Sequence, residues 1–196
     1  MMLETCAIPA DHLLACYAQG LFPMADSASG PIRWYSADPR GIIDLEQFHV
    51  PRRLARGLRS HPFTITLNQE FESVVRHCGQ RADTWISEGI IQSYLELHRL
   101  GYAHSVEARV EGELVGGLYG VALQAAFFGE SMFHLAPNAS KAALVALVGR
   151  LRERGYLLLD TQMVTPVTRQ FGATEIPEAA YHRRLRQALR KRCRFA

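Results

Sequence analysis

The sequence predicts an α+β fold built on a mixed, largely antiparallel sheet, and three features of residues 104–160 support this prediction. Residues 104–133 are rich in Val, Tyr and Phe and turn at Glu111-Gly112, which is typical of an antiparallel meander. An amphipathic helix ending at Gly155 follows, and residues 156–160 then form a short apolar run of the kind found in buried strands. Strands followed by a helix and a buried strand differ from the regular alternation of a doubly wound fold.

The residues before the meander predict a small N-terminal unit. Asp11 is suited to cap a short helix that Gly20 ends, and the chain turns again at Asp38-Pro39-Arg40-Gly41. We therefore expect a small N-terminal domain over residues 1–38 and a second, catalytic domain over residues 39–196. Apolar periodicity and Gly/Pro breaks place further helices near residues 51–60, 69–78, 87–100, 164–171 and 177–190, and a strand near residues 63–67.

The long helix after the meander is predicted to begin at Asn138 or Ser140, either of which can cap it. One known fold with this order of elements is the N-acetyltransferase-like (GNAT-like) fold, in which this helix points its N-terminus at an acyl donor. Free N–H groups and the helix dipole favour an anionic or oxygen-rich ligand there. Residues 136–141 contain no glycine-rich turn that would wrap a pyrophosphate, which disfavours coenzyme A as the donor.

Composition limits the class of protein. With 196 residues, 48% hydrophobic and 21% charged, the chain can bury a core as one domain or as one domain with a small appendage. It has neither an apolar run of bilayer length nor a secretory signal, so we expect a cytoplasmic protein that does not enter a membrane. Cys6, Cys16, Cys78 and Cys193 lack metal-ligand spacing, so we expect reduced thiols and no metal.

The net charge of +3 is unevenly distributed, because residues 183–196 contain seven basic residues and no acid. A second basic cluster follows Pro51, where Arg52, Arg56 and Arg59 share one face of a predicted helix. Guanidinium groups on one face suit phosphate contacts, which makes these three arginines candidates for binding phosphate groups. The same pattern also fits an ordinary solvated helix face, and charge alone does not decide between the two.

Two polar segments border the predicted core. Gly129 to Phe133 places Glu130 in a tightly packed strand, and Asp160-Thr161-Gln162 ends the buried strand. Residues two apart in a strand share a face, so we expect the Asp160 and Gln162 side chains together and Thr161 opposite. An acid beside an amide can attract a proton from a reacting group, although a lone Asp at a strand end is also often only a helix cap.

Eight short motifs, in order along the chain, resemble those of the bacterial leucyl/phenylalanyl-tRNA–protein transferases. They are Leu21-Phe22-Pro23-Met24, Asp38-Pro39-Arg40, Thr84-Trp85-Ile86, His104-Ser105-Val106-Glu107, Leu114 to Val121, Gly129 to Phe133, Asn138 to Lys141 and Asp160-Thr161-Gln162. The resemblance implies an enzyme that moves Leu or Phe from aminoacyl-tRNA to the N-terminal Arg or Lys of acceptor proteins, marking them for degradation by the N-end rule. No cofactor is needed, since the aminoacyl ester is already activated.

With this resemblance, Asp160 and Gln162 are the predicted catalytic residues. Gly129, Glu130 and Ser131 are expected to contact the tRNA 3′ end, and Trp85 and Phe127 to stack on its terminal adenine. The predicted aminoacyl pocket consists of Leu118, Met132, Leu144, Leu147, Leu151 and Leu159. Each of these apolar residues also suits an ordinary core.

Other functions stay open. A coenzyme A-dependent N-acetyltransferase would use the same fold, and a non-catalytic RNA-binding module would use the arginine clusters. The preference among Leu, Phe and Met donors is open as well, because Leu147 and Leu151 stand where aromatic residues can occur in the family, and Met24 where a tryptophan can. Nor does the sequence choose an acceptor subsite among Glu107, Glu130 and Asp160.

Overall fold

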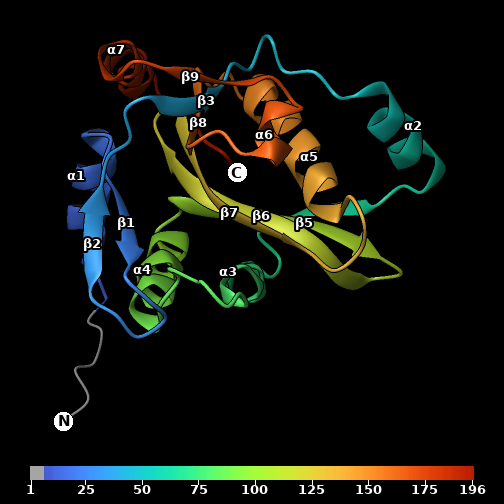
Figure 1. The fold of residues 1–196 in the computed structure, drawn as a ribbon, viewed down its shortest axis with the longest axis horizontal. Helices are drawn as coiled ribbons and strands as arrows, with labels where there is room; N and C mark the ends of the chain where they lie inside the picture. The colour runs from blue at the N-terminus through green and yellow to red at the C-terminus, as the bar shows by residue number, and fades with distance from the viewer. Residues whose placement is uncertain (1–6) are drawn as a thin grey trace.

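The structure is a computed structural model that describes residues 7–196, so Cys6 lies outside the described part of the chain. Its centre is a seven-stranded sheet with the order β4-β5-β6-β7-β8-β3-β9 (Figure 1). All neighbouring strands are antiparallel except β7 and β8, which are parallel. The strands are β3 (Arg40–Ile43), β4 (Thr64–Leu67), β5 (Ala103–Val110), β6 (Glu113–Leu123), β7 (Ala126–His134), β8 (Leu158–Gln162) and β9 (Ala173–Ile176). This mixed, largely antiparallel sheet confirms the predicted fold class.

The predicted meander is confirmed as β5, β6 and β7. Its first turn uses positive φ angles at Glu111 (52°) and Gly112 (88°). The β6–β7 pairing shifts register between Tyr119 and Gly120. A Cβ at Gly120 would collide with the Phe128 carbonyl oxygen, so only glycine fits where the two strands approach at this irregularity.

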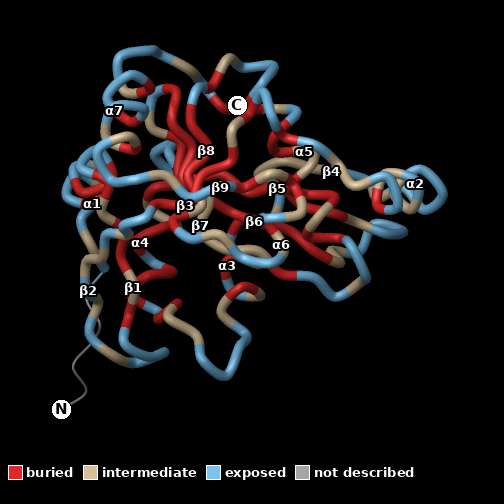
Figure 2. The backbone as a smooth tube through the Cα atoms, turned by 45° about the horizontal axis from the view of Figure 1, so that its top comes forward, coloured by how far each residue is buried: buried red, intermediate tan, exposed pale blue. Residues whose placement is uncertain are grey.

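Helices cover both faces of the sheet (Figure 1). One face packs against α5 (Ala139–Glu153), and the other packs against α3 (Phe71–Gly79) and α4 (Glu88–Arg99). Burial is concentrated in the strands between these layers, whereas α2 (Arg52–Ser60) projects as a largely exposed helix (Figure 2). The connection from β7 through α5 to parallel β8 is the arrangement expected of an N-acetyltransferase-like domain.

The β7–β8 pairing is short and determines where the sheet opens. Phe128 pairs with Asp160, and no pairing follows although β7 continues to His134. Residues 129–134 of β7 therefore have a strand neighbour, β6, on only one side. The gap between the two diverging strands is the natural place for a ligand in this sheet.

The N-terminal residues form α1 (Ala10–Ala18) and a separate two-stranded sheet of β1 (Phe22–Ala25) and β2 (Ile32–Tyr35). Side chains from both, including Leu13, Tyr17 and Phe22, join the hydrophobic core under α3 and α4. The first strand of the large sheet begins at Arg40. The proposed division at residues 38 and 39 stays a prediction.

Several local predictions were wrong. Arg40 and Gly41 do not belong to the predicted turn, because both are buried at the start of β3 between β8 and β9. β9 was missed between α6 (Pro166–Arg169) and α7 (Glu178–Leu189), since four-residue strands carry little periodicity. The predicted caps at Asp11 and Ser140 were wrong, because both residues lie inside their helices. Asn138 does occupy the N-cap position of α5, but it has φ 69° and its side chain makes no capping hydrogen bond.

Candidate active site

A cavity of about 890 Å³ lies where β7 and β8 diverge. Residues of β6, β7, the C-terminal end of α3, the first half of α5, the end of β8 and α6 line it. One part of the wall is apolar and is formed mainly by leucines facing α5, whereas the part near Glu130 and Gln162 is polar. The cavity is therefore suited to a ligand with one apolar group and one reactive polar end.

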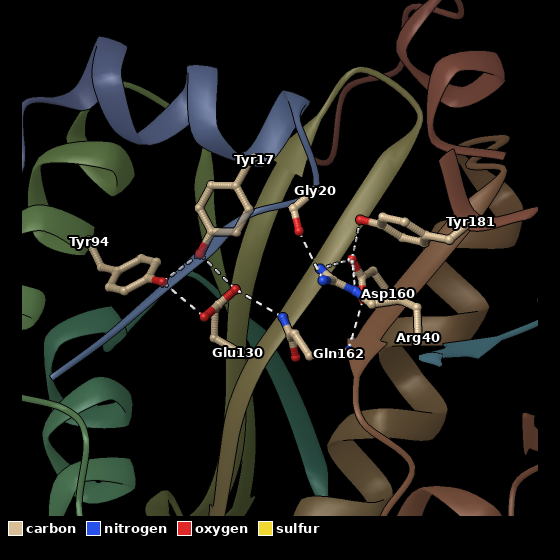
Figure 3. Close-up of polar contacts among 8 residues, drawn as sticks. All are labelled: Tyr17, Gly20, Arg40, Tyr94, Glu130, Asp160, Gln162 and Tyr181. Atoms are coloured by element: carbon tan, nitrogen blue, oxygen red, sulfur yellow. Dashed lines mark hydrogen bonds and ion pairs between the residues drawn. The ribbon is translucent and has the colours of Figure 1, made fainter. Parts of the chain in front are cut away.

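Glu130 on β7 is the centre of the polar part (Figure 3). Tyr17 of α1 donates its hydroxyl to Glu130 Oε1 at 2.7 Å, and Tyr94 of α4 donates to Oε2 at 2.9 Å. Gln162 Nε2 also donates to Oε1, at 3.3 Å. Burial raises the pKa of Glu130 to about 7, although the two tyrosine hydroxyls oppose the shift. A carboxyl group with this pKa exchanges protons readily near neutral pH.

Asp160 is held in a buried ion pair beside this cluster (Figure 3). Arg40 Nε donates to its Oδ1 at 2.9 Å, and Arg40 Nη2 to its Oδ2 at 2.7 Å. The Tyr181 hydroxyl donates to Oδ2 at 2.6 Å and the Gln162 backbone N–H to Oδ1 at 2.8 Å. The Arg40 guanidinium also donates to the Gly20 carbonyl. Both carboxylate oxygens of Asp160 accept these hydrogen bonds, so the geometry indicates that Asp160 holds Arg40, Tyr181 and Gln162 in place.

The end of β8 differs from the expected alternation. Gln162 has φ 54°, so the chain leaves the extended conformation at this residue. Asp160 accepts the Gln162 N–H and thereby stabilises this turn. As a result Thr161 and Gln162 both line the cavity and Asp160 does not, whereas the sequence placed Asp160 and Gln162 together and Thr161 opposite. A positive φ outside glycine leaves no clear signal in a sequence.

Most of the predicted site residues meet at the cavity. Its lining includes Gly129, Glu130, Ser131 and Gln162 from the polar set, and Leu118, Met132, Leu144, Leu147 and Leu159 from the apolar set. They come from β6, β7, α5 and β8, and the divergence of β7 from β8 brings them around one space. Their individual roles stay predictions.

Four of the residues predicted for catalysis, the tRNA 3′ end or the aminoacyl pocket do not line the cavity. Besides Asp160, Leu151 is completely buried one helical turn beyond Leu147 and belongs to the core under α5. Phe127 is also completely buried, with its ring against Phe195, so it offers no face to an adenine and its predicted stacking role is wrong. Trp85 is half-buried against the hydrophobic core under α3 and α4 and does not line the cavity.

The three α2 arginines lie away from the cavity. Arg52, Arg56 and Arg59 are exposed, and within residues 7–196 none of them forms an ion pair. Leu54 is the only buried residue of this helix. The phosphate-binding role of the arginines stays a prediction.

Sequence reasoning missed the residues that support Glu130 and Asp160. Arg40 precedes a Gly-Ile-Ile strand, and a charge beside such a run is a weak signal of a buried ion pair. Tyr17, Tyr94 and Tyr181 lie in amphipathic helices, where a tyrosine is usually taken as a core residue. Glu107, which the sequence offered as an acceptor contact, does not line the cavity and instead accepts hydrogen bonds from Thr66, Ser105 and the Glu70 N–H.

Residues 7–196 contain neither a cluster of metal ligands nor a helix of membrane-spanning character. No group of three or more His, Cys, Asp or Glu side chains in this range is placed to hold a metal ion, and none of its helices is long and apolar enough to cross a membrane.

The sequence matches a known family over nearly its whole length. The family described as leucyl/phenylalanyl-tRNA protein transferase matches residues 42–186, and the N-terminal domain of that family matches residues 7–38. A leucyl/phenylalanyl-tRNA–protein transferase of Rubrobacter xylanophilus is 55% identical over 185 residues, which cover 94% of this chain and 96% of that protein. The protein of the same name from Paramagnetospirillum magneticum is 54% identical, over 93% of this chain and 90% of that one.

Solved structures give weaker matches. A ribosomal-protein-alanine N-acetyltransferase from Brucella melitensis biovar Abortus 2308 is 21% identical with a TM-score of 0.38, over 56% of this chain and 87% of that one. L-PGS from Bacillus licheniformis is 18% identical with a TM-score of 0.46, over 90% of this chain and 57% of that one. The strand order of the chain itself defines its fold class.

Proposed function

The chain belongs to the leucyl/phenylalanyl-tRNA–protein transferase family, an aminoacyltransferase family that uses aminoacyl-tRNA, and from this premise we propose that the cavity between β7 and β8 is its active site. The proposed acceptors are proteins that begin with Arg or Lys, and the added Leu or Phe marks them for degradation in the cytoplasm. Glu130 supports a cationic acceptor, because it is the only carboxylate in the cavity lining within the described residues.

The apolar part of the cavity is the proposed pocket for the donor amino acid. Leu118 and Met132 from the sheet face Leu144 and Leu147 of α5, and Leu159 completes the wall. Burying a leucine or phenylalanine side chain there contributes about 1.5–3 kcal/mol and places its ester carbonyl at the polar part. The pocket thereby couples recognition of the amino acid to its orientation.

Gln162 is the proposed contact of the attacking amine. Its Nε2 donates to Glu130, which leaves the amide oxygen to accept a hydrogen bond from the acceptor α-amine. As the amine nitrogen bonds to the carbonyl carbon, its proton passes to the Glu130 carboxylate. The ester C–O bond then breaks, and the ribose oxygen takes up this proton from the Glu130 carboxyl group, which restores the carboxylate. Asp160 and Arg40 act on this step indirectly, by holding the turn at Gln162.

The observation that carries this proposal is the Gln162 side chain, which is held at Glu130 and lines the cavity. The test is transfer of labelled Leu from charged tRNA to a peptide beginning with Arg, compared with the same peptide beginning with Ala. We expect transfer to the Arg peptide only, and a loss of about a hundredfold or more in Gln162→Ala with unchanged unfolding. Equal transfer by Gln162→Ala would contradict the role of Gln162, and turnover with acetyl-coenzyme A instead of charged tRNA would favour the N-acetyltransferase alternative.

A further inference from the structure

The lining of the cavity includes cationic side chains that the proposed transfer step does not use. Arg81 follows the C-terminal end of α3, and Lys141 lies in the first turn of α5, so the two come from helices on opposite faces of the sheet. Both line the cavity, together with His77 and His134. Glu130 is the only carboxylate among the lining residues, all of which lie in the described part of the chain. Apart from Glu130, the charged groups of the lining are therefore cationic.

Arg81 is held in place without losing its charge. Its Nη2 donates to the Met132 carbonyl and, at 3.3 Å, to the Ser131 hydroxyl, both on β7. Neither acceptor is charged, and no ion pair within residues 7–196 includes Arg81. A guanidinium has five N–H donors, so these two contacts leave others for a ligand. Arg76 differs, because it bonds Glu72 and Glu88.

Lys141 adds a second charge from the other side of the cavity. It is half-buried, and no hydrogen bond or ion pair in the described structure uses its ammonium group. The first turn of α5 contains no acid, so the positive end of the helix dipole also remains uncompensated there. The helix end adds to the attraction for an anion that the two side chains already create.

The proposed donor brings an anion to this place. In an aminoacyl-tRNA the reacting ester is on the ribose of the terminal adenosine, and the nearest negative charge is the phosphodiester that joins this adenosine to the penultimate nucleotide. Two cations that line the same cavity as Glu130 and Gln162 suit that group, because Arg and Lys bind phosphate through charge-assisted hydrogen bonds. A cationic acceptor N-terminus, by contrast, is repelled by these two side chains.

We propose that Arg81 and Lys141 bind the phosphodiester between the terminal adenosine and the penultimate nucleotide of the donor tRNA, and thereby position the ester beside Gln162. This inference rests on the proposed function, since it takes the cavity as the site of the tRNA 3′ end. It assigns the two residues a contact different from that of the α2 arginines, whose phosphates would lie elsewhere on the tRNA.

Three donors separate these contacts: leucyl-tRNA, a leucylated cytidylyl-adenosine with one phosphodiester, and leucyl-adenosine with none. In Arg81→Met and Lys141→Met we expect kcat/KM on the dinucleotide, divided by that on leucyl-adenosine, to fall about tenfold. Arg81→Lys keeps the positive charge but loses the guanidinium with its paired N–H donors. Its ratio should lie between those of Arg81→Met and the wild-type protein. The matched control Arg76→Met removes a cation that already has carboxylate partners, and the ratio should stay at the wild-type value.

Two results would overturn the inference. An equal loss on all three donors would show that Arg81 only shapes the cavity through Met132 and Ser131. A ratio unchanged in both methionine variants would show that neither residue senses the phosphodiester. Failure of the proposed function looks different, because the wild-type protein would then transfer leucine from none of the three donors.

Discussion

Arg40 and Asp160 form a completely buried, two-point ion pair between strands β3 and β8, although they are 120 residues apart in the chain. Burying two charges is costly unless their remaining hydrogen-bonding groups are also satisfied. Here Tyr181, the Gly20 carbonyl and the Gln162 N–H complete the set. The pair therefore joins the N-terminal segment, α7 and the end of β8 at one point beside the cavity (Figure 3).

Breaking this pair on one side should destabilise the fold strongly. In Asp160→Asn the Arg40 charge stays buried without compensation, and we expect a loss of about 3–5 kcal/mol in the free energy of unfolding. Urea denaturation measures this loss. The double variant Arg40→Met with Asp160→Leu should recover much of the stability, but not transfer, because the Gln162 N–H then has no carboxylate to accept its hydrogen bond. Wild-type stability in Asp160→Asn would contradict this account.

Glu130 should make stability depend on pH. Its pKa rises from 4.5 to about 7 on folding, so the folded protein binds this proton more tightly than the unfolded chain. The stability that this tighter proton binding contributes is fully present below pH 4.5 and is lost as pH rises through about 7. As pH rises from 4.5 to above about 7, the wild-type protein should lose up to about 3 kcal/mol of its free energy of unfolding through this group. Glu130→Gln should not show this loss, because glutamine does not ionise. Unfolding curves at pH 4.5 and about pH 8 measure the change, and a constant difference between the proteins would refute it.

The same group should control the rate. Ionisation of Glu130 supplies the proposed proton acceptor, so kcat/KM for transfer should rise with pH through about 7 and level off above it. Glu130→Gln should have a low kcat/KM at all pH values, without the rise through about pH 7. A limb near about pH 8 from the acceptor α-amine remains in both proteins and serves as the internal reference. If the rise of kcat/KM at about pH 7 persisted in Glu130→Gln, it would have to come from the ionisation of another group.

Leu147 should help set the choice of amino acid. Leu147→Phe fills part of the apolar pocket, so we expect kcat/KM for Phe-tRNA relative to Leu-tRNA to fall by about tenfold. Donor competition among Leu, Phe and Met measures the ratio. Leu151→Ala is the matched control on the same helix: it should cost about 2–5 kcal/mol of stability and leave the ratio unchanged, because Leu151 does not line the cavity. An altered ratio in Leu151→Ala alone would contradict the assigned pocket.

The α2 arginines should act only on full-length tRNA. Replacing Arg52, Arg56 or Arg59 by Ala should lower the slope of log binding against log salt by about one for each phosphate that the variant no longer neutralises. Transfer from leucyl-adenosine should keep its wild-type kcat/KM, since this donor has no phosphate for an arginine to bind. Arg53→Ala is the control from outside the shared face. Equal losses on both donors would exclude a phosphate role.

The long, regular secondary-structure elements could be predicted from the sequence. The meander, α5 and the buried strand β8 follow from residue periodicity over many positions, and most apolar residues expected around the site do line the cavity. The family could also be identified from the sequence, because motifs such as Gly129 to Phe133 and Asp160 to Gln162 follow one another in the same order as in the family. These features depend on local spacing, which a sequence carries directly.

The relationships among distant side chains were decided only by the tertiary structure. Arg40 lies in a strand of four residues, too short for a periodic signal, and finds Asp160 only because β3 inserts between β8 and β9. Gln162 turns toward Glu130 through a positive φ that a hydrogen bond from its own backbone to Asp160 stabilises. The sequence therefore determined the fold class and the apolar wall, whereas burial and long-range hydrogen bonding determined which polar groups reach the cavity and which only hold the others in place.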